Sequence, residues 1–179
     1  MSLAALNPTA MEAALAAAAK ARGRQPFTLP HRRMEAWRWS DLRAQLRDMP
    51  PPSVGAATGP SIFSSKGVAE IRIADGRIAH AEEIEGARIA RSQRAVEGSH
   101  ALEKLADLFA TETLEIDIDR PLMKPLLVRR IAGAGAAHAR ICVRLGAGAS
   151  ALVIETVESA ADAFNNAAIA YEVGEGATL

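Results

Sequence analysis

The sequence is most informative at residues 29–42, which read Leu29-Pro30-His31-Arg32-Arg33-Met34-Glu35-Ala36-Trp37-Arg38-Trp39-Ser40-Asp41-Leu42. This stretch holds both tryptophans of a 179-residue chain in which 4% of the residues are aromatic, and arginines flank both indoles. Because tryptophan contributes a large apolar surface to any core that it enters, the sequence predicts that a compact unit packs around Trp37 and Trp39.

Composition limits the function classes that suit this chain. Its 21 Lys and Arg residues balance 21 Asp and Glu residues, which argues against general binding to nucleic acid or to an anionic membrane. One cysteine excludes an internal disulfide, so a cytoplasmic location is the default. No apolar run approaches the ~20 residues of a membrane span. Residues 1–19 lack the basic start of a secretory signal.

Changes in composition divide the chain into four predicted segments. The first carries helical patterns, and the second is a mobile linker, because its prolines and small residues leave too little apolar surface to offset the ordering entropy. In the fourth, the apolar period changes from about 3.6 to about 2. The segments are residues 1–48 (N-terminal helical unit), 49–66 (Pro/Gly/Ser-rich linker), 67–112 (hairpin plus amphipathic helix) and 113–179 (start of a β-helix core).

Local signals place single elements within these segments. Thr9 can cap a first helix, and Asp41 stands where a second, short helix would begin. Asp75-Gly76 supplies the two positive-φ positions of a hairpin turn. Residues 99–110 repeat apolar side chains at helical spacing. Four strands are predicted at residues 126–131, 139–145, 151–158 and 167–173.

A short repeat suggests how these strands are arranged. Residues 145–150 and 173–178 align at a spacing of 28, each as apolar-Gly-x-Gly-Ala-Ser/Thr after a strand. Repeated strand–turn–strand units without helices predict the first coils of a β-solenoid. Because Leu179 follows a repeat motif directly, without a cap, we expect a fragment of a longer protein. An open solenoid end would also allow a homodimer.

Two motifs raise the question of a chemical site. Residues 146–151 match the dinucleotide fingerprint Gly-x-Gly-x-x-Ala, but the β-branched run that follows predicts a strand instead of the required helix, which favours a tight turn. Cys142 alternates with Arg140 and Arg144, so a strand would place the thiol between two guanidiniums that lower its pKa. A structural cysteine and a reactive or cluster-handling cysteine are both compatible with this pattern.

Titratable residues elsewhere favour structural roles. The histidines do not have the spacing of a metal site, so we expect them at the surface or at helix caps: His31, His80, His100 and His138. Asp117 and Asp119 share a strand face and could act as an acid–base pair, but the apolar residues opposite favour a solvated face. We assign no catalytic, cofactor-binding or metal-binding residue.

The basic residues around the tryptophans allow a further interpretation. Arg32, Arg33 and Arg38 with the two indoles could hold single-stranded nucleic acid. The balanced charge and Glu35 within the cluster favour instead an arginine packed internally over an indole.

Residues 29–42 resemble the L-P-x-R-R-x-E-x-W-[KR]-[YW]-[ST]-D-L stretch near the start of SufD proteins, of the SufB/SufD family in the SUF iron–sulfur cluster assembly system. Trp39 and Ser40 replace the usual tyrosine and threonine. A second stretch is similar to the point where the β-helix core of that family begins: Asn165-Asn166-Ala167, followed by Val173-Gly174-Glu175-Gly176-Ala177 and Leu179.

The resemblance implies an α+β fold, with the N-terminal helical unit followed by the first coils of a right-handed β-helix. It further implies a non-catalytic scaffold subunit that works with SufB and the ATPase SufC. The iron–sulfur cluster and a flavin would belong to the full complex, and this chain would bind neither. The family's contact and cluster-assembly residues lie in a later region, so none is assigned here.

Two functions of other classes stay open. A β-solenoid carbohydrate-active enzyme would need carboxylates that converge in a groove, and the candidates are Asp117, Asp119, Glu155 and Glu158. A plain protein-interaction module would use the unit around Trp37 and Trp39 to dock a partner.

Overall fold

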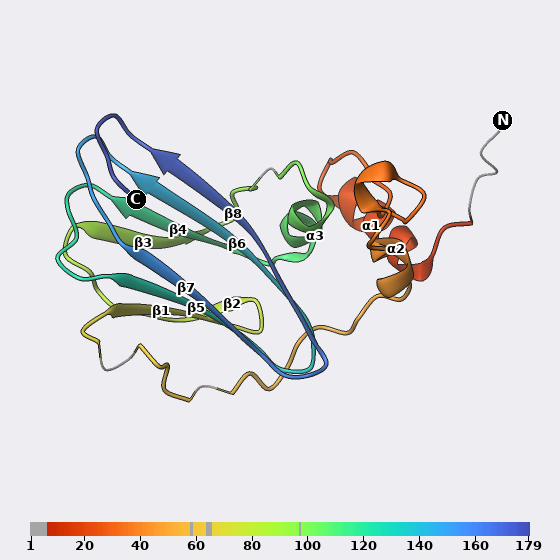
Figure 1. Cartoon of the computed structure of the whole chain (residues 1–179), viewed down its shortest axis with the longest axis horizontal. Helices are drawn as coiled ribbons and strands as arrows, with labels where there is room; N and C mark the ends of the chain where they lie inside the picture. Colours follow the sequence, from red (N-terminus) through yellow and green to blue (C-terminus); the bar gives the residue numbers. More distant parts are fainter. Residues whose placement is uncertain (1–6, 58, 64–65, 97) are drawn as a thin grey trace. The chain divides into compact units, whose positions relative to one another are not determined.

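The computed structural model describes residues 7–57, 59–63, 66–96 and 98–179. The chain divides into two compact units, Met1–Pro50 and Pro51–Leu179 (Figure 1). The first unit contains the helix α1 (Ala10–Ala21), the 3-10 turn η1 (Glu35–Trp37) and the short helix α2 (Leu42–Gln45). The border at Pro50 lies close to the predicted end of the helical unit at residue 48.

Capping interactions define the helices of the unit Met1–Pro50. The Thr9 hydroxyl accepts a hydrogen bond from the Glu12 N–H at 3.2 Å, and the Glu12 carboxylate accepts one from the Thr9 N–H at 2.8 Å. This reciprocal pair confirms the predicted cap of α1. Asp41 caps α2, as predicted, by accepting from the Ala44 N–H at 2.9 Å. The buried residues of this unit are mostly aliphatic: Met11, Leu15, Ala19, Leu29, Leu42 and Leu46.

The unit Pro51–Leu179 consists mainly of two four-stranded sheets, drawn as separate layers in Figure 1. The first sheet has the order β2-β1-β5-β7, with β1 (Ala69–Ala74), β2 (Arg77–Ala81), β5 (Leu126–Ala132) and β7 (Val153–Ser159). The second has the order β3-β4-β6-β8, with β3 (Ala87–Ser92), β4 (Thr113–Ile118), β6 (Gly135–Leu145) and β8 (Ala163–Val173).

The prediction of an α+β fold with a right-handed β-helix, or β-solenoid, is wrong. The described residues form two mixed sheets of four strands with three helices. In a β-helix, every strand would continue parallel from one coil to the next. Here the Asp75-Gly76 turn reverses the chain, so β2 pairs antiparallel with β1, and β3 pairs antiparallel with β4 in the other sheet.

The strand predictions themselves are confirmed, with small differences in their bounds. Asp75 (φ 48°) and Gly76 (φ 77°) adopt the predicted positive-φ turn between β1 and β2. The strands β5 to β8 cover the four predicted strands. The 28-residue spacing of the repeat is also the register between β6 and β8, in which Gly135 pairs with Ala163. Ser150 pairs with Thr178 at the same offset.

Alternating side chains from both sheets build one core between the layers. Ile71 and Ile73 contribute from β1, Ile116 from β4 and Ile141 and Val143 from β6, and all five are at most 3% exposed. Because successive residues of a strand point to opposite faces, the alternate positions carry polar and charged residues outward. The outer faces of the two sheets therefore hold the ionisable groups described below.

Residues 51–57 are attached to this unit by hydrogen bonds. The Ser53 N–H donates to the Ala136 carbonyl at 2.9 Å, and the Val54 N–H donates to the Ala134 carbonyl at 3.1 Å. The Asp75 carboxylate accepts from the Ser53 hydroxyl at 2.5 Å. It also accepts from the N–H groups of Ala56 at 3.1 Å and Gly133 at 2.9 Å. The first part of the predicted linker therefore lies against the sheets.

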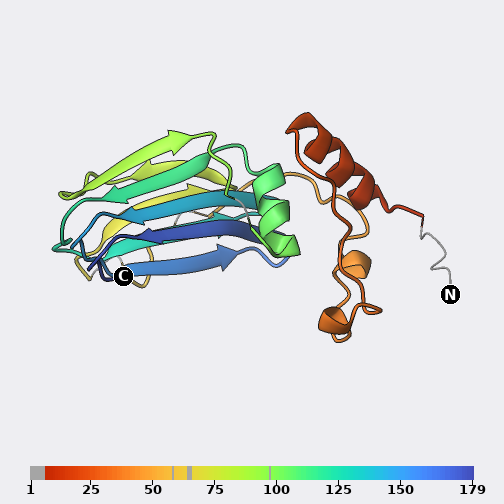
Figure 2. The ribbon, with the colours of Figure 1, turned by 90° about the horizontal axis from the view of Figure 1, so that it is seen from above.

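The helix α3 (Ala101–Phe109) covers the outer face of the second sheet, against β6 and β8 (Figure 2). It confirms the predicted amphipathic helix, and His100 occupies its N-cap. Its own residues Leu105, Ala106 and Leu108 are buried. The Asn166 side chain on β8 donates to the Leu102 carbonyl at 2.8 Å, which joins the helix to the sheet.

Candidate functional site

Residues 31–40, the Trp39 segment, form consecutive exposed turns that carry both tryptophans. The N–H groups of Met34, Trp37 and Ser40 each donate to the carbonyl three residues before them, all at 2.9 Å. Trp37 is half-buried, and Trp39 is 87% exposed. The prediction that a compact unit packs around both indoles is therefore wrong. An aliphatic core provides enough buried surface for this unit without Trp39.

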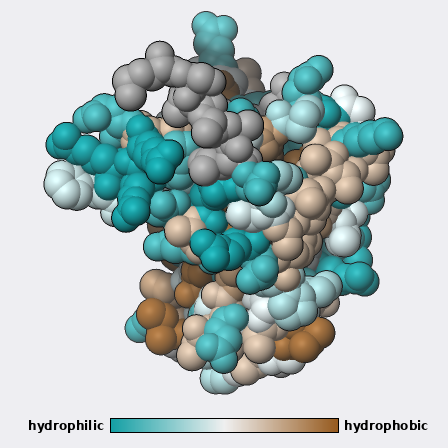
Figure 3. Space-filling model, turned by 90° about the vertical axis from the view of Figure 1, so that its right-hand side faces the viewer, coloured by the Kyte–Doolittle hydropathy of each residue, from teal (hydrophilic) through white to brown (hydrophobic). Residues whose placement is uncertain are grey.

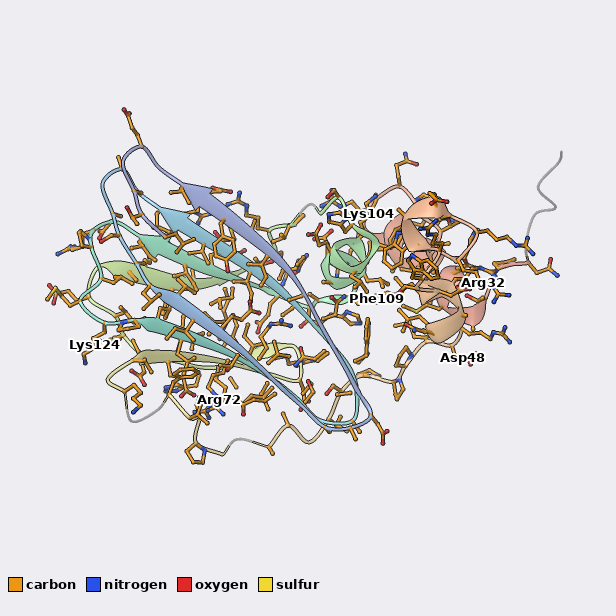
Figure 4. All side chains as sticks on the ribbon, viewed as in Figure 1. Arg32, Asp48, Arg72, Lys104, Phe109 and Lys124 are labelled. Carbon is orange, nitrogen blue, oxygen red and sulfur yellow. The ribbon has the colours of Figure 1, made fainter. Side chains whose placement is uncertain are left out.

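An arginine does lie over an indole in the Trp39 segment, but on the surface. The Arg38 guanidinium carbon is 4.9 Å from the centroid of the Trp39 ring, and Arg38 Nη1 donates to Glu35 Oε1 at 3.2 Å. Both side chains of this ion pair are largely exposed. Arg32, labelled in Figure 4, and Arg33 are exposed as well. The expected internal packing of an arginine on an indole is thus replaced by a surface contact.

A second group of sequence candidates lies on the outer face of the β3-β4-β6-β8 sheet. The side chains of β6 that do not enter the core share this face: His138, Arg140, Cys142 and Arg144. The predicted alternation around Cys142 is confirmed, because Ile141 and Val143 belong to the core.

Arg144 is the centre of an ion-pair network on this face. Its Nε donates to Asp117 Oδ1 and its Nη2 to Glu115 Oε2, both at 2.5 Å, and Arg88 also binds Asp117. The Arg144 guanidinium holds the pKa of Asp117 below its ordinary value. For Glu115, a hydrogen bond from the Ser92 hydroxyl and then Arg144 lower the pKa. These carboxylates are charged partners of arginines, so they are unsuited to act as general acids near neutral pH.

Cys142 is buried within this network, and its environment differs from the expected one. Its Sγ lies 3.9 Å from both Arg144 Nη1 and Glu172 Oε1. Burial raises the pKa of the thiol, because desolvation outweighs the nearby arginines and the Glu172 carboxylate offsets them. The expected lowering of the pKa is therefore wrong, and the geometry favours the structural role among the two that the sequence allowed.

The histidines lie in four different settings. His138 packs between Phe109 and Phe164, and burial lowers its pKa to about 4, so its imidazole is neutral at physiological pH (Figure 4 labels Phe109). His31 Nδ1 accepts from the Arg33 N–H at 3.2 Å. His31 is half-buried, whereas His80 is exposed on β2 and His100 stands at the N-cap of α3, so the expectation of surface or cap positions holds for His80 and His100. For the buried His138 it is wrong.

The four carboxylates proposed for an enzyme groove are dispersed. Asp117 binds Arg144 on the second sheet, and Asp119 binds Arg120 at 3.1 Å while 72% exposed. On the first sheet, Glu155 binds Arg130 at 2.5 Å and Glu158 binds Arg129 at 2.8 Å. Each carboxylate has its own arginine, and the two pairs belong to different sheets. They do not form a facing pair on either side of a substrate.

The Gly-x-Gly motif also has the predicted structural role. Gly148 adopts φ 70° in the turn after β6, and the strand β7 follows this turn. A dinucleotide site would need a helix N-terminus at this point.

The sequence interpretation missed a groove between β2 and β3, the outer strands on one side of the two sheets. This β2–β3 groove has a volume of about 750 Å³. Ile78, Ile84 and Ile89 line its apolar part, and Glu82, Glu83 and Glu85 lie in the loop that joins the strands. The run Glu-Glu-Ile-Glu-Gly is the sequence signal that marks this loop, but only the pairing of both sheets shows that a groove opens beside it.

No protein-family model matches the chain, and no curated protein matches it significantly. The resemblance to the SufB/SufD family therefore rests on the residues of this chain. Within the described ranges, no helix is long and apolar enough to cross a membrane. The same ranges contain no group of three or more His, Cys, Asp or Glu side chains that could hold a metal ion.

Proposed function

We propose that this chain belongs to a non-catalytic scaffold subunit of the SUF iron–sulfur cluster assembly machinery, which works in the cytoplasm with SufB and the ATPase SufC. The observation that carries the proposal is the pattern of residues 29–42, in which proline, two arginines, glutamate and tryptophan stand at the offsets of the SufD stretch. Balanced net charge supports protein partners over nucleic acid or a membrane.

The positions of the motif residues are consistent with a recognition segment held at both ends. Leu29 and Leu42 are buried, and Asp41 caps α2. Between these ends, Arg32 and Trp39 face solvent. Such an arrangement displays polar and aromatic side chains from a fixed base, as a scaffold subunit would need for contacts with other subunits.

The proposal gives this chain a supporting part in the chemistry. The iron–sulfur cluster and the flavin are handled by the full complex, and this chain contributes no catalytic, cofactor-binding or metal-binding residue. Its contribution is to hold partners in place.

Affinity purification from the native cells tests this proposal. The full protein that carries this sequence is tagged and expressed from its own gene, and the copurified proteins are identified by mass spectrometry. We expect SufB-type and SufC-type proteins to be enriched over a purification with a tagged, unrelated cytoplasmic protein. Recovery of the intact tagged protein with neither partner enriched would contradict the proposal.

The structure bears differently on the two alternative functions, a carbohydrate-active enzyme and a protein-interaction module. The carbohydrate-active enzyme loses its support, because Asp117, Asp119, Glu155 and Glu158 are separate and each is paired with an arginine. The protein-interaction module gains an observation in its favour, the exposed indole of Trp39. Tryptophan and arginine are enriched among the residues that carry binding energy at protein interfaces.

A further inference from the structure

The β2–β3 groove combines an apolar surface with unpaired acidic residues. Ile84 and Ile89 are half-buried, so the core leaves part of each side chain accessible from the groove. Glu82 and Glu83 are exposed, and among the described residues no basic side chain forms an ion pair with either. The groove therefore has an apolar floor and an acidic end.

The two arginines that line the groove do not neutralise this acidic end. Arg88 is bound to Asp117 on the neighbouring strand β4. Arg91 donates to the Ile78 carbonyl at 2.7 Å and lies 3.8 Å from the Glu112 carboxylate. Both guanidiniums already have acceptors, Arg88 on the neighbouring strand and Arg91 on β2 of the other sheet and at Glu112, so a docked segment would meet the glutamates as the available charges.

The Trp39 segment has the complementary chemistry. Residues 1–50 contain eight Lys and Arg residues and four Asp and Glu residues. Arg32 and Arg33 are exposed, and no carboxylate of the described residues pairs with them. Trp39 stands beside them as an apolar anchor that is 87% exposed. By contrast, residues 51–179 contain thirteen Lys and Arg residues and seventeen Asp and Glu residues.

We propose that the Trp39 segment of one copy of this chain docks into the β2–β3 groove of a second copy. The Trp39 indole contacts Ile84 and Ile89, while Arg32 and Arg33 face the glutamates of the 82–85 loop. A groove of about 750 Å³ has the size of a typical ligand site and accommodates an indole. The inference does not depend on a role in the SUF system.

The small size of the contact determines its affinity, and its lack of symmetry determines which assemblies it can form. A ten-residue segment buries less surface than a standard protein interface, so we expect weak association that weakens further when salt screens the charges. Each copy presents one segment and one groove, so the contact is heterologous, and it leads to a reciprocal dimer, a larger ring or an open chain. The average mass should therefore rise with concentration above that of the monomer.

Sedimentation velocity of the full chain, over a range of concentrations, tests the proposal through exchanged charges. Arg33→Glu reverses a charge of the segment, and Glu83→Arg reverses a charge of the groove. Each variant alone would bring like charges together, so it should stay monomeric at concentrations where the unmodified protein associates. An equimolar mixture of the two variants should associate again, because the intact segment of Glu83→Arg can enter the intact groove of Arg33→Glu. Neither residue is buried, so both variants should fold, which far-UV circular dichroism checks.

Matched variants separate this contact from other causes of association. Trp39→Ala should weaken the association at least about tenfold, as expected for an anchor residue. Lys124→Glu, before β5 (Figure 4), and Glu175→Arg, after β8, reverse exposed charges elsewhere and should leave the association unchanged.

Three results would overturn the proposal. The first is a protein that stays monomeric at all concentrations. The second is association that survives Arg33→Glu and Glu83→Arg, or that is lost in the Lys124→Glu or Glu175→Arg controls, since another surface would then be responsible. The third is a monomer that binds single-stranded oligothymidylate through Trp39, which would assign the segment to nucleic acid.

Discussion

At the scale of single residues, His138 couples the stability of the sheet unit to pH. Its ring centroid lies 5.4 Å from that of Phe109 and 5.6 Å from that of Phe164, and burial lowers its pKa from 6.5 to about 4. Between these two pKa values, the unfolded chain binds a proton that the folded chain excludes. The free energy of unfolding must therefore fall as the pH falls from about 6.5 to about 4.

A substitution that removes the titrating group isolates this contribution. When the pH is lowered from about 7.5 to about 5, the titration of His138 should lower the free energy of unfolding of the unmodified protein by about 2 kcal/mol. His138→Gln keeps a neutral polar side chain. Its free energy of unfolding should therefore fall by about 2 kcal/mol less than that of the unmodified protein over the same pH interval, as measured by urea unfolding of the sheet unit. The exposed His80→Gln is the control and should behave like the unmodified protein. Equal losses for all three proteins would show that His138 does not titrate as described.

Trp39 is a second residue whose surroundings bear on function. Its environment is decided by a few neighbours, with the Arg38 guanidinium on one face of the ring and solvent around most of it. Strongly hydrophobic side chains occupy only small, separate areas on the face drawn in Figure 3. The exposed indole of Trp39 with its adjacent arginines is suited to anchor a small contact.

At the scale of elements, residues 51–57 depend on a close approach of two backbones. A Cβ added at Gly133 would lie 1.8 Å from the Val54 carbonyl oxygen, which is a backbone atom and cannot rotate away. The hydrogen bonds from Ser53 and Val54 to the chain around Gly133 require this proximity. The glycine thus permits a proline-rich segment to lie along the sheet.

Gly133→Ala should release this segment. We expect the amide hydrogens of Ser53 and Val54 to exchange at least about tenfold faster, because their carbonyl partners move out of reach. Hydrogen–deuterium exchange resolved to residues 51–57 measures the effect. Gly59→Ala, in the same connection but with no heavy atom within 4 Å of the added carbon, is the control and should change nothing there. Unchanged exchange in Gly133→Ala would contradict the close approach.

The bounds of most elements could be predicted, whereas their partners could not. The cap at Thr9, the turn at Asp75-Gly76 and the strand alternation around Ile141 each depend on residues a few positions apart. The strand β3 was missed, because its alternation is interrupted by Ala90 and its edge position gives it a mixed pattern of burial. Its pairing with β4 joins residues 31 apart at the Ala87–Ile118 end.

At the scale of the whole molecule, the two units have separate aliphatic cores. The core of Met1–Pro50 includes Leu15, and the core between the sheets includes Ile116, both fully buried. Both tryptophans lie in the first unit, so tryptophan fluorescence reports on that unit alone. Circular dichroism of the strands reports mainly on the second.

Paired core substitutions test whether the units unfold separately. Leu15→Ala should destabilise the first unit by about 3 kcal/mol and lower the midpoint followed by tryptophan fluorescence, while the midpoint of the strand signal stays unchanged. Ile116→Ala, the matched change in the second unit, should have the reverse effect. Urea unfolding followed by both signals makes the comparison. If either variant shifted both midpoints equally, the chain would unfold as one cooperative unit.

The amino-acid sequence by itself determined the local features: the helix caps, the hairpin turn, the 28-residue repeat and the positions of most strands. These features depend on hydrogen bonds and side-chain alternation over short distances, which a sequence displays directly. Only the tertiary structure decided the sheet orders, the exposure of Trp39 and the raised pKa of Cys142. Strand pairing, burial and desolvation depend on which distant residues become neighbours, and local patterns do not specify those neighbours.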